Sequence, residues 1–157
     1  MATSTAAAAA QGIDQLAIIK DEQISAPIEI VFETILEQLG PGMQTMDGKS
    51  LHMKLEAWPG GRWFRDLGNN NGHLWGHVQA IRSPDLLEIY GPLMMSGATV
   101  SGVQYRLFAE GGKTRVHLEH RAMGVFPPAA VDGMGKGWGA SLGQIRDAAE
   151  RKAKGAK

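Results

Sequence analysis

Histidines are the side chains of this sequence best suited to metal or acid–base chemistry, and two of them lie close together in the stretch GHLWGH. If this stretch is a strand, His73 and His77 are separated by roughly 13 Å, which is too far to share one metal ion. On a helix the same spacing would bring both rings to one ion, but the flanking glycines and the following VQAI favour a strand. We therefore predict no metal site here and expect two polar histidines at the rim of the fold.

His120 and Arg65 are the polar side chains that could enter a pocket. His120 shares one face of a predicted strand with Val116 and Leu118, so it should point inward. It could donate a hydrogen bond to a ligand there, although a buried histidine satisfied by a backbone carbonyl is the more common case. Arg65 shares a strand face with Trp63, so it either enters the pocket and favours an acidic ligand, or faces solvent.

Aromatic and sulfur side chains could line a pocket without reacting. Methionine adapts its shape to varied guests, and aromatic rings offer large apolar surfaces. For any single residue of this kind, ordinary core packing is the commoner role. With the two polar residues above, the candidate ligand-binding residues are Trp63, Arg65, Trp75, Met94, Tyr105, His120, Met134 and Trp138.

The sequence lacks the best-known catalytic signatures, namely G-x-S-x-G, H-E-x-x-H and the phosphate-binding G-x-x-x-x-G-K-[ST]. Four carboxylates, Asp66, Glu88, Glu110 and Glu119, fall on separate predicted strands. Whether two of them converge as an acid–base pair is not visible in the sequence. We therefore name no catalytic residue and no cofactor, and an enzymatic role stays open.

The elements that position these residues are a series of strands framed by two helices. A strand over 16–24 leads to Ser25-Ala26-Pro27, where a capping side chain and a proline precede apolar residues at helical spacing, so we expect a helix over 27–39. A long amphipathic helix should begin near residue 129. Between them, alternating residues predict strands over 51–58, 62–67, 73–81, 86–90, 99–110 and 113–123. This order predicts an α+β fold with an antiparallel sheet and helices on one side.

Four stretches occur in order along the chain: ISAPIEIVFETI at 24–35, WPGGRW at 58–63, GHVQAIRSPDLLE at 76–88, and GGKTRVHLEH at 111–120 ahead of Gly137-Trp138. Together they resemble the START-like (SRPBCC) superfamily, in particular the bacterial branch named after the activator of the heat-shock-protein ATPase. The resemblance implies a helix-grip fold, in which a curved antiparallel sheet of about six to seven strands wraps around a long C-terminal helix. It also implies a cavity between sheet and helix that holds an apolar ligand.

The chain departs from the family pattern after its first helix. The family usually carries a short, aromatic-rich helical segment there, whereas this chain has GPGMQTMDGKS at 40–50. We therefore expect the entrance of the pocket to differ at this point.

Composition sets limits on partners and location. The 157 residues contain 16 Lys plus Arg and 16 Asp plus Glu, so a formal net charge of zero argues against nucleic acid as a partner. Cysteine is absent and no apolar run could span a bilayer, which favours a soluble protein in the reducing cytoplasm. We expect a disordered tail over 1–12 and one domain over 13–154, as a monomer or homodimer.

The function we expect is binding of a small apolar or amphipathic ligand in the cavity between the sheet and the last helix, without evident catalysis. Two alternatives remain. An enzyme could use the same cavity, with His120, Arg65 or Tyr105 as acid, base or polariser. A co-chaperone-like domain could contact a chaperone ATPase through the outer face of the sheet, although the residues support this less than the family name does.

Overall fold

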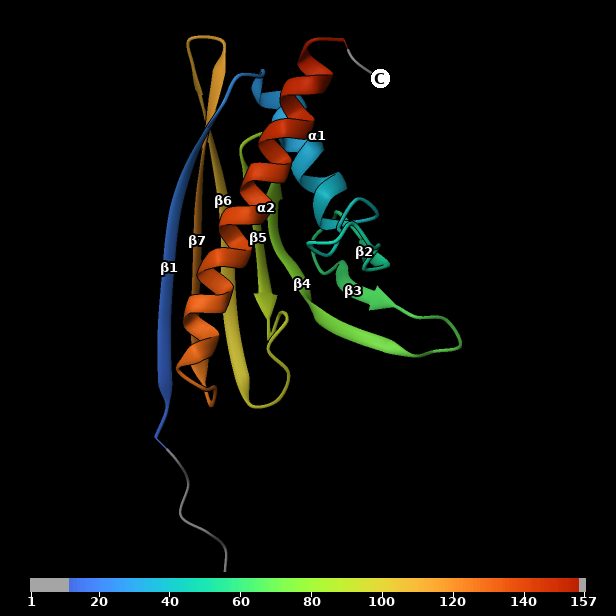
Figure 1. Cartoon of the computed structure of the whole chain (residues 1–157), viewed down its shortest axis with the longest axis vertical. Helices are drawn as coiled ribbons and strands as arrows, with labels where there is room; N and C mark the ends of the chain where they lie inside the picture. Colours follow the sequence, from blue (N-terminus) through green and yellow to red (C-terminus); the bar gives the residue numbers. More distant parts are fainter. Residues whose placement is uncertain (1–11, 156–157) are drawn as a thin grey trace, which may run out of the picture.

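The computed structural model describes residues 12–155, and in this part of the chain all strands form one antiparallel sheet (Figure 1). The strands are β1 (Asp14–Ile24), β2 (Met53–Leu55), β3 (Arg62–Asp66), β4 (Gly72–Arg82), β5 (Leu86–Gly91), β6 (Thr99–Glu110) and β7 (Lys113–Gly124). Their order across the sheet is β1-β7-β6-β5-β4-β3-β2. Strands β2 to β7 thus form a simple meander, and β1 completes the sheet beside β7. The tail expected over 1–12 lies, except for Gly12, outside the described residues.

Two helices cover one face of this sheet (Figure 1). Helix α1 (Ile28–Leu39) packs against α2 (Ala129–Ala153), and α2 runs along the sheet and also contacts β1. The buried residues of α2 follow a spacing of three or four, as expected for an amphipathic helix: Met134, Trp138, Leu142, Ile145 and the pair Ala148 and Ala149. The predicted α+β class and helix-grip arrangement are confirmed. Within residues 12–155, neither helix is long and apolar enough to cross a membrane.

The long hairpin of β6 and β7 lies under α2, whose Trp138 contacts Tyr105 of β6 and His120 of β7. Its residues alternate between buried and exposed over most of its length, because successive side chains of a strand point to opposite faces. The buried set on β6 is Thr99, Ser101, Val103, Tyr105 and Leu107. The buried set on β7 includes Val116, Leu118 and His120, as the sequence predicted.

Strand β4 bends sharply away from the rest of the sheet (Figure 1). Its pairing with β3 skips Trp75, since Trp63 pairs with Gly76 while Phe64 pairs with Leu74. Such a bulge increases the local twist and kinks the strand. Gly76 is required here, because a Cβ at this position would lie 2.4 Å from the carbonyl oxygen of Tyr90.

Two local expectations were wrong. The strand expected over 51–58 is limited to Met53–Leu55. His52 before it has a φ of 52°, and Glu56 after it bonds through both its backbone and its carboxylate to Arg62. Ser25 also does not cap α1; its backbone N–H instead donates to the Glu150 carboxylate of α2 (3.0 Å).

Candidate functional site

A cleft of about 480 Å³ opens between the N-terminal half of α2 and two irregular connections, the one after α1 and the one between β5 and β6. Within the described part of the chain, every side chain that lines it is uncharged. Besides its methionines, the lining consists of Gln38, Gln44, Thr45, Ala130, Gly133, Gly137, Trp138, Ala140, Ser141 and Gln144. A concave, mostly apolar surface with a few neutral polar groups is typical of small-molecule sites.

Methionine dominates the cleft. Five of the eight methionines of the sequence meet there: Met43, Met46, Met94, Met95 and Met134. They come from three separate segments, since the first two follow α1, the next two follow β5, and the last lies on α2. Because thioether side chains are flexible and polarizable, such a lining can adapt to apolar guests of different shapes.

Two glycines of α2 make the cleft wider, because they have no side chains to fill it. Gly133 and Gly137 line it one turn apart, and a Cβ built on either would meet nothing within 4 Å. Neighbouring atoms therefore do not require glycine at these positions. Each glycine inside a helix costs roughly 0.5–1 kcal/mol relative to alanine. At Gly133 and Gly137 α2 is therefore less stable than it would be with alanine, and the absence of side chains there leaves open space in the cleft.

Trp138 forms the inner wall of the cleft and connects it to the core. Its indole Nε1 donates to His120 Nδ1 (2.9 Å), and its ring packs edge-on against His120 and Tyr105, with centroids 5.6 and 6.4 Å away. An indole N–H can only donate, so Nδ1 must accept and the proton of the neutral imidazole resides on Nε2. Burial lowers the pKa of His120 to about 4, which keeps the ring neutral near pH 7.

A row of buried polar groups lies behind Trp138 on the inner face of β6 and β7. Four of its atoms have no hydrogen-bond partner among residues 12–155: Thr99 Oγ1, Ser101 Oγ, Tyr105 Oη and His120 Nε2. Buried polar atoms in native proteins are nearly always bonded, and leaving one unpaired costs about 1–3 kcal/mol. Burial also raises the pKa of the Tyr105 phenol well above its usual range, so that it stays protonated.

The structure brings five of the predicted site residues together. Met94, Met134 and Trp138 line the cleft, and Tyr105 and His120 lie directly behind Trp138. The partner of His120 is a tryptophan N–H, where the sequence favoured a backbone carbonyl.

Trp63, Trp75 and Arg65 lie outside this group. Trp63 is fully buried, donates through Nε1 to the Leu39 carbonyl at the end of α1 (2.7 Å), and packs edge-on against Trp75 with ring centroids 5.0 Å apart. Arg65 is half-buried on the same strand as Trp63, and its Nε donates to the Leu51 carbonyl (3.1 Å). Trp75 donates to His73 Nδ1 (3.0 Å). These contacts fix the β3–β4 end of the sheet.

Met43 and Met46 are site residues that sequence reasoning did not identify. They belong to the segment GPGMQTMDGKS, which departs from the family pattern. An irregular connection has no periodicity, so the direction of its side chains cannot be inferred. The departure itself was the available signal, since it indicated that the pocket entrance would be built differently.

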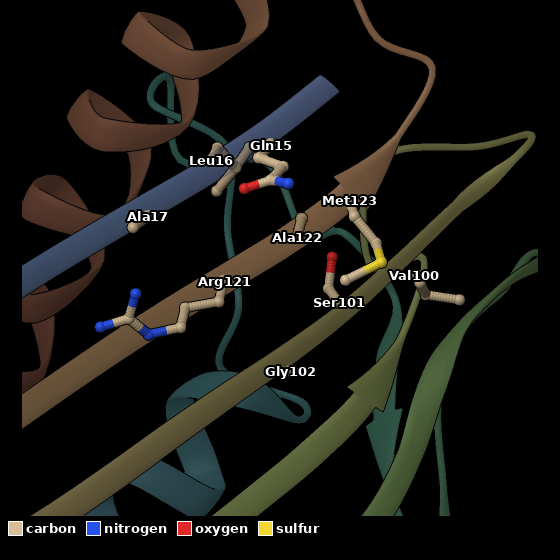
Figure 2. Close-up of a pocket in the computed structure, with 9 residues that line it drawn as sticks. All are labelled: Gln15, Leu16, Ala17, Val100, Ser101, Gly102, Arg121, Ala122 and Met123. Carbon is tan, nitrogen blue, oxygen red and sulfur yellow. The ribbon is translucent and has the colours of Figure 1, made fainter. Parts of the chain in front are cut away.

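A second hollow, of about 540 Å³, lies on strands β1, β7 and β6 (Figure 2). The exposed residues that border it face away from the helices. It forms because Ala17 and Gly102 flank Arg121 on neighbouring strands and leave the sheet uncovered, while Arg121 and Met123 rise from β7 (Figure 2). A guest there would contact only the strands of the sheet, whereas the methionine-lined cleft has walls from a helix and two connections. We therefore regard the cleft as the better binding site.

A charged cluster crosses the outer face of β1 and β7. His117 lies with Nε2 3.0 Å from Glu119 Oε1 and Nδ1 3.0 Å from Asp21 Oδ1. Hydrogen bonds to these two carboxylates raise the pKa of His117, and the bond to His117 lowers the pKa of Asp21. The cluster ties the edge strand β1 to its neighbour β7.

No family model and no curated protein sequence matches this chain. Among solved structures, it is similar to an uncharacterised protein from Rhizobium leguminosarum, with 17% identity over 89% of this chain and 97% of the other and a TM-score of 0.71. CalU16 from Micromonospora echinospora gives 19% identity over 90% and 88%, with a TM-score of 0.60. DynU16, a protein of the dynemicin biosynthetic locus, gives 15% identity over 90% of this chain and 49% of the other, with a TM-score of 0.61. At these identities the similarities define the fold alone.

Proposed function

We propose that this protein binds a small apolar or amphipathic molecule in the methionine-lined cleft between α2 and the connections after α1 and β5. The observation that carries the proposal is the uncharged, methionine-rich lining of a cleft of about 480 Å³. This volume falls in the range of roughly 300–1,000 Å³ that is usual for small-molecule sites. A bicyclic aromatic guest that buries about 200 Å² would gain about 5 kcal/mol from burial alone.

As part of the same proposal, we place residues 13–154 in the START-like superfamily and in its branch named after the activator of the heat-shock-protein ATPase. The four sequence stretches noted above support the branch, and the helix-grip fold supports the superfamily. The similarity to DynU16, a protein of a biosynthetic locus, is compatible with a small-molecule guest. We propose a ligand of metabolic origin held without a metal or cofactor.

Blocking the cleft from α2 tests this proposal. Gly137→Leu would place a side chain into the cleft, where a Cβ meets nothing within 4 Å. Gly135→Leu is the matched control, because its Cβ is equally unobstructed but Gly135 does not line the cleft. Both changes replace a poor helix former by a good one, so neither should unfold the protein.

The assay is fluorescence titration with N-phenyl-1-naphthylamine, an uncharged apolar probe. We expect saturable binding at one site, weakened at least tenfold by Gly137→Leu and changed less than twofold by Gly135→Leu. Absence of saturable binding to the unmodified protein, or equal effects of the two variants, would contradict the proposal.

A further inference from the structure

The four unpartnered polar groups behind Trp138 occupy one strip of the sheet. His120 pairs with Val103 across β6 and β7, and Ser101 and Tyr105 are the inward-facing residues on either side of Val103. Diagonal neighbours of this kind lie roughly 7–8 Å apart between their backbones. The side chains of His120 and Tyr105 are both 0% exposed. Both rings also pack against Trp138, so their unpaired atoms belong to the same part of the core, away from solvent.

The chemistry of this strip favours an acceptor. The bond from Trp138 to Nδ1 leaves His120 Nε2–H as an obligatory donor. The Tyr105 hydroxyl is a second donor, and the hydroxyls of Ser101 and Thr99 can donate as well. A guest oxygen, such as that of a carbonyl or hydroxyl group, could accept from the two donors that pack against Trp138, namely His120 and Tyr105.

The same strip disfavours an anion. The buried side chains among residues 12–155 include no Lys, Arg, Asp or Glu, and the cleft lining is uncharged. A carboxylate carried into this region would lose its hydration without gaining a counter-ion. An uncharged oxygen avoids that penalty.

Access to the strip depends on Trp138 and the helix that carries it. Trp138 is shared by the cleft and the polar row, so a displacement of its ring would join the two. The neutral His120 imidazole would still carry one N–H that can donate after its bond to Trp138 is released. The helix around it contains Gly133 and Gly137, which line the cleft and whose Cβ positions meet nothing within 4 Å. Glycine lowers the cost of bending or fraying a helix, so this part of α2 can move where the ligand has to pass.

We infer that the ligand is an uncharged molecule with an apolar body and a terminal carbonyl or hydroxyl oxygen. The apolar body lies in the methionine-lined cleft, and the oxygen accepts hydrogen bonds from the His120 imidazole N–H and the Tyr105 hydroxyl, which both lie behind Trp138 in the present structure. This inference rests on the proposed function and adds the chemical class of the ligand.

The test uses three naphthalenes that differ in one substituent: 2-acetylnaphthalene, 2-ethylnaphthalene and 2-naphthoate. Dissociation constants are measured for the unmodified protein, for Tyr105→Phe and for His120→Phe. Tyr105→Phe removes only an unpartnered hydroxyl, so it should fold even if His120→Phe does not. We expect the ketone to bind about tenfold more tightly than the ethyl compound, as for one or two buried hydrogen bonds. Naphthoate should bind weakest.

The variants decide which groups recognise the oxygen. Tyr105→Phe should remove most of the preference for the ketone and leave the affinity for 2-ethylnaphthalene within twofold. If ketone and ethyl compound bind equally well, or if the preference survives both variants, the polar row does not recognise the ligand and the inference is overturned, while the proposed cleft stands. If naphthoate binds most tightly, the ligand class is wrong. If none of the three binds, the proposed function fails and the inference with it.

Discussion

The buried His120 predicts a specific loss of stability at mildly acid pH. Its pKa is lowered from 6.5 to about 4 by burial, so the unfolded chain binds a proton more readily than the folded protein between these values. Stability from this group is therefore present above pH 6.5 and is lost as the pH falls toward 4. Integrating the two titrations from pH 7 to pH 5 gives a loss of about 2 kcal/mol.

The perturbation is His120→Phe, which removes the titrating group. The free energy of unfolding should be measured by urea denaturation, followed by tryptophan fluorescence, at pH 7, 6 and 5. Whatever His120→Phe costs at pH 7, we expect that cost to shrink by about 2 kcal/mol at pH 5, because only the unmodified protein pays for keeping the imidazole neutral.

His117→Gln is the control with the opposite sign. The pKa of His117 is raised by its hydrogen bonds to Glu119 and Asp21, so its stabilisation is present below pH 6.5 and lost as the pH rises through the folded pKa. Removing it should cost about 0.5–1 kcal/mol at pH 5 and less at pH 8. If the cost of His120→Phe is the same at pH 7 and pH 5, the folded protein protonates His120 normally, and the argument for a neutral Nε2–H donor is refuted.

Three substitutions test the packing around the site by urea denaturation. Gly135→Ala should raise the free energy of unfolding by about 0.5–1 kcal/mol, because its Cβ meets nothing within 4 Å; a loss would mean that α2 requires glycine there. Gly76→Ala should lower the free energy of unfolding by about 2 kcal/mol or more, because the added Cβ would lie 2.4 Å from the Tyr90 carbonyl oxygen. An unchanged free energy of unfolding would mean that the backbone at Gly76 is not packed this closely. Trp63→Phe should cost about 2–3 kcal/mol, since it removes the bond to the Leu39 carbonyl, and a cost below 1 kcal/mol would contradict this role.

The regular parts of the fold could be predicted from the sequence. The alternation in β6 and β7 placed His120 on the inner face, and the helical spacing of Met134 and Trp138 placed both on the buried side of α2. These predictions succeeded because periodicity reports which face of a regular element is buried.

The parts of the site that lie outside regular helices and strands could not be predicted from the sequence. Met43 and Met46 lie in an irregular connection, so no pattern indicated that they face α2. The bulge at Trp75 inserts one residue into β4, and alternation counted along the sequence cannot detect it. The link from Trp138 to His120 joins residues 18 apart, and such tertiary pairs leave no local signal.

The order of the strands in the sheet affects when each strand can pair during synthesis of the chain. Strand β1 pairs only with β7, and the paired residues are 90 to 110 positions apart, from Ile24 with Thr114 to Asp14 with Gly124. The other strands pair with sequence neighbours and can form hairpins as the chain lengthens. Strand β1 is made before the other strands of this sheet but can pair only after β7 has been made, and such long-range pairing is slow. During synthesis its edge and its apolar face stay open to chaperones and to other nascent chains.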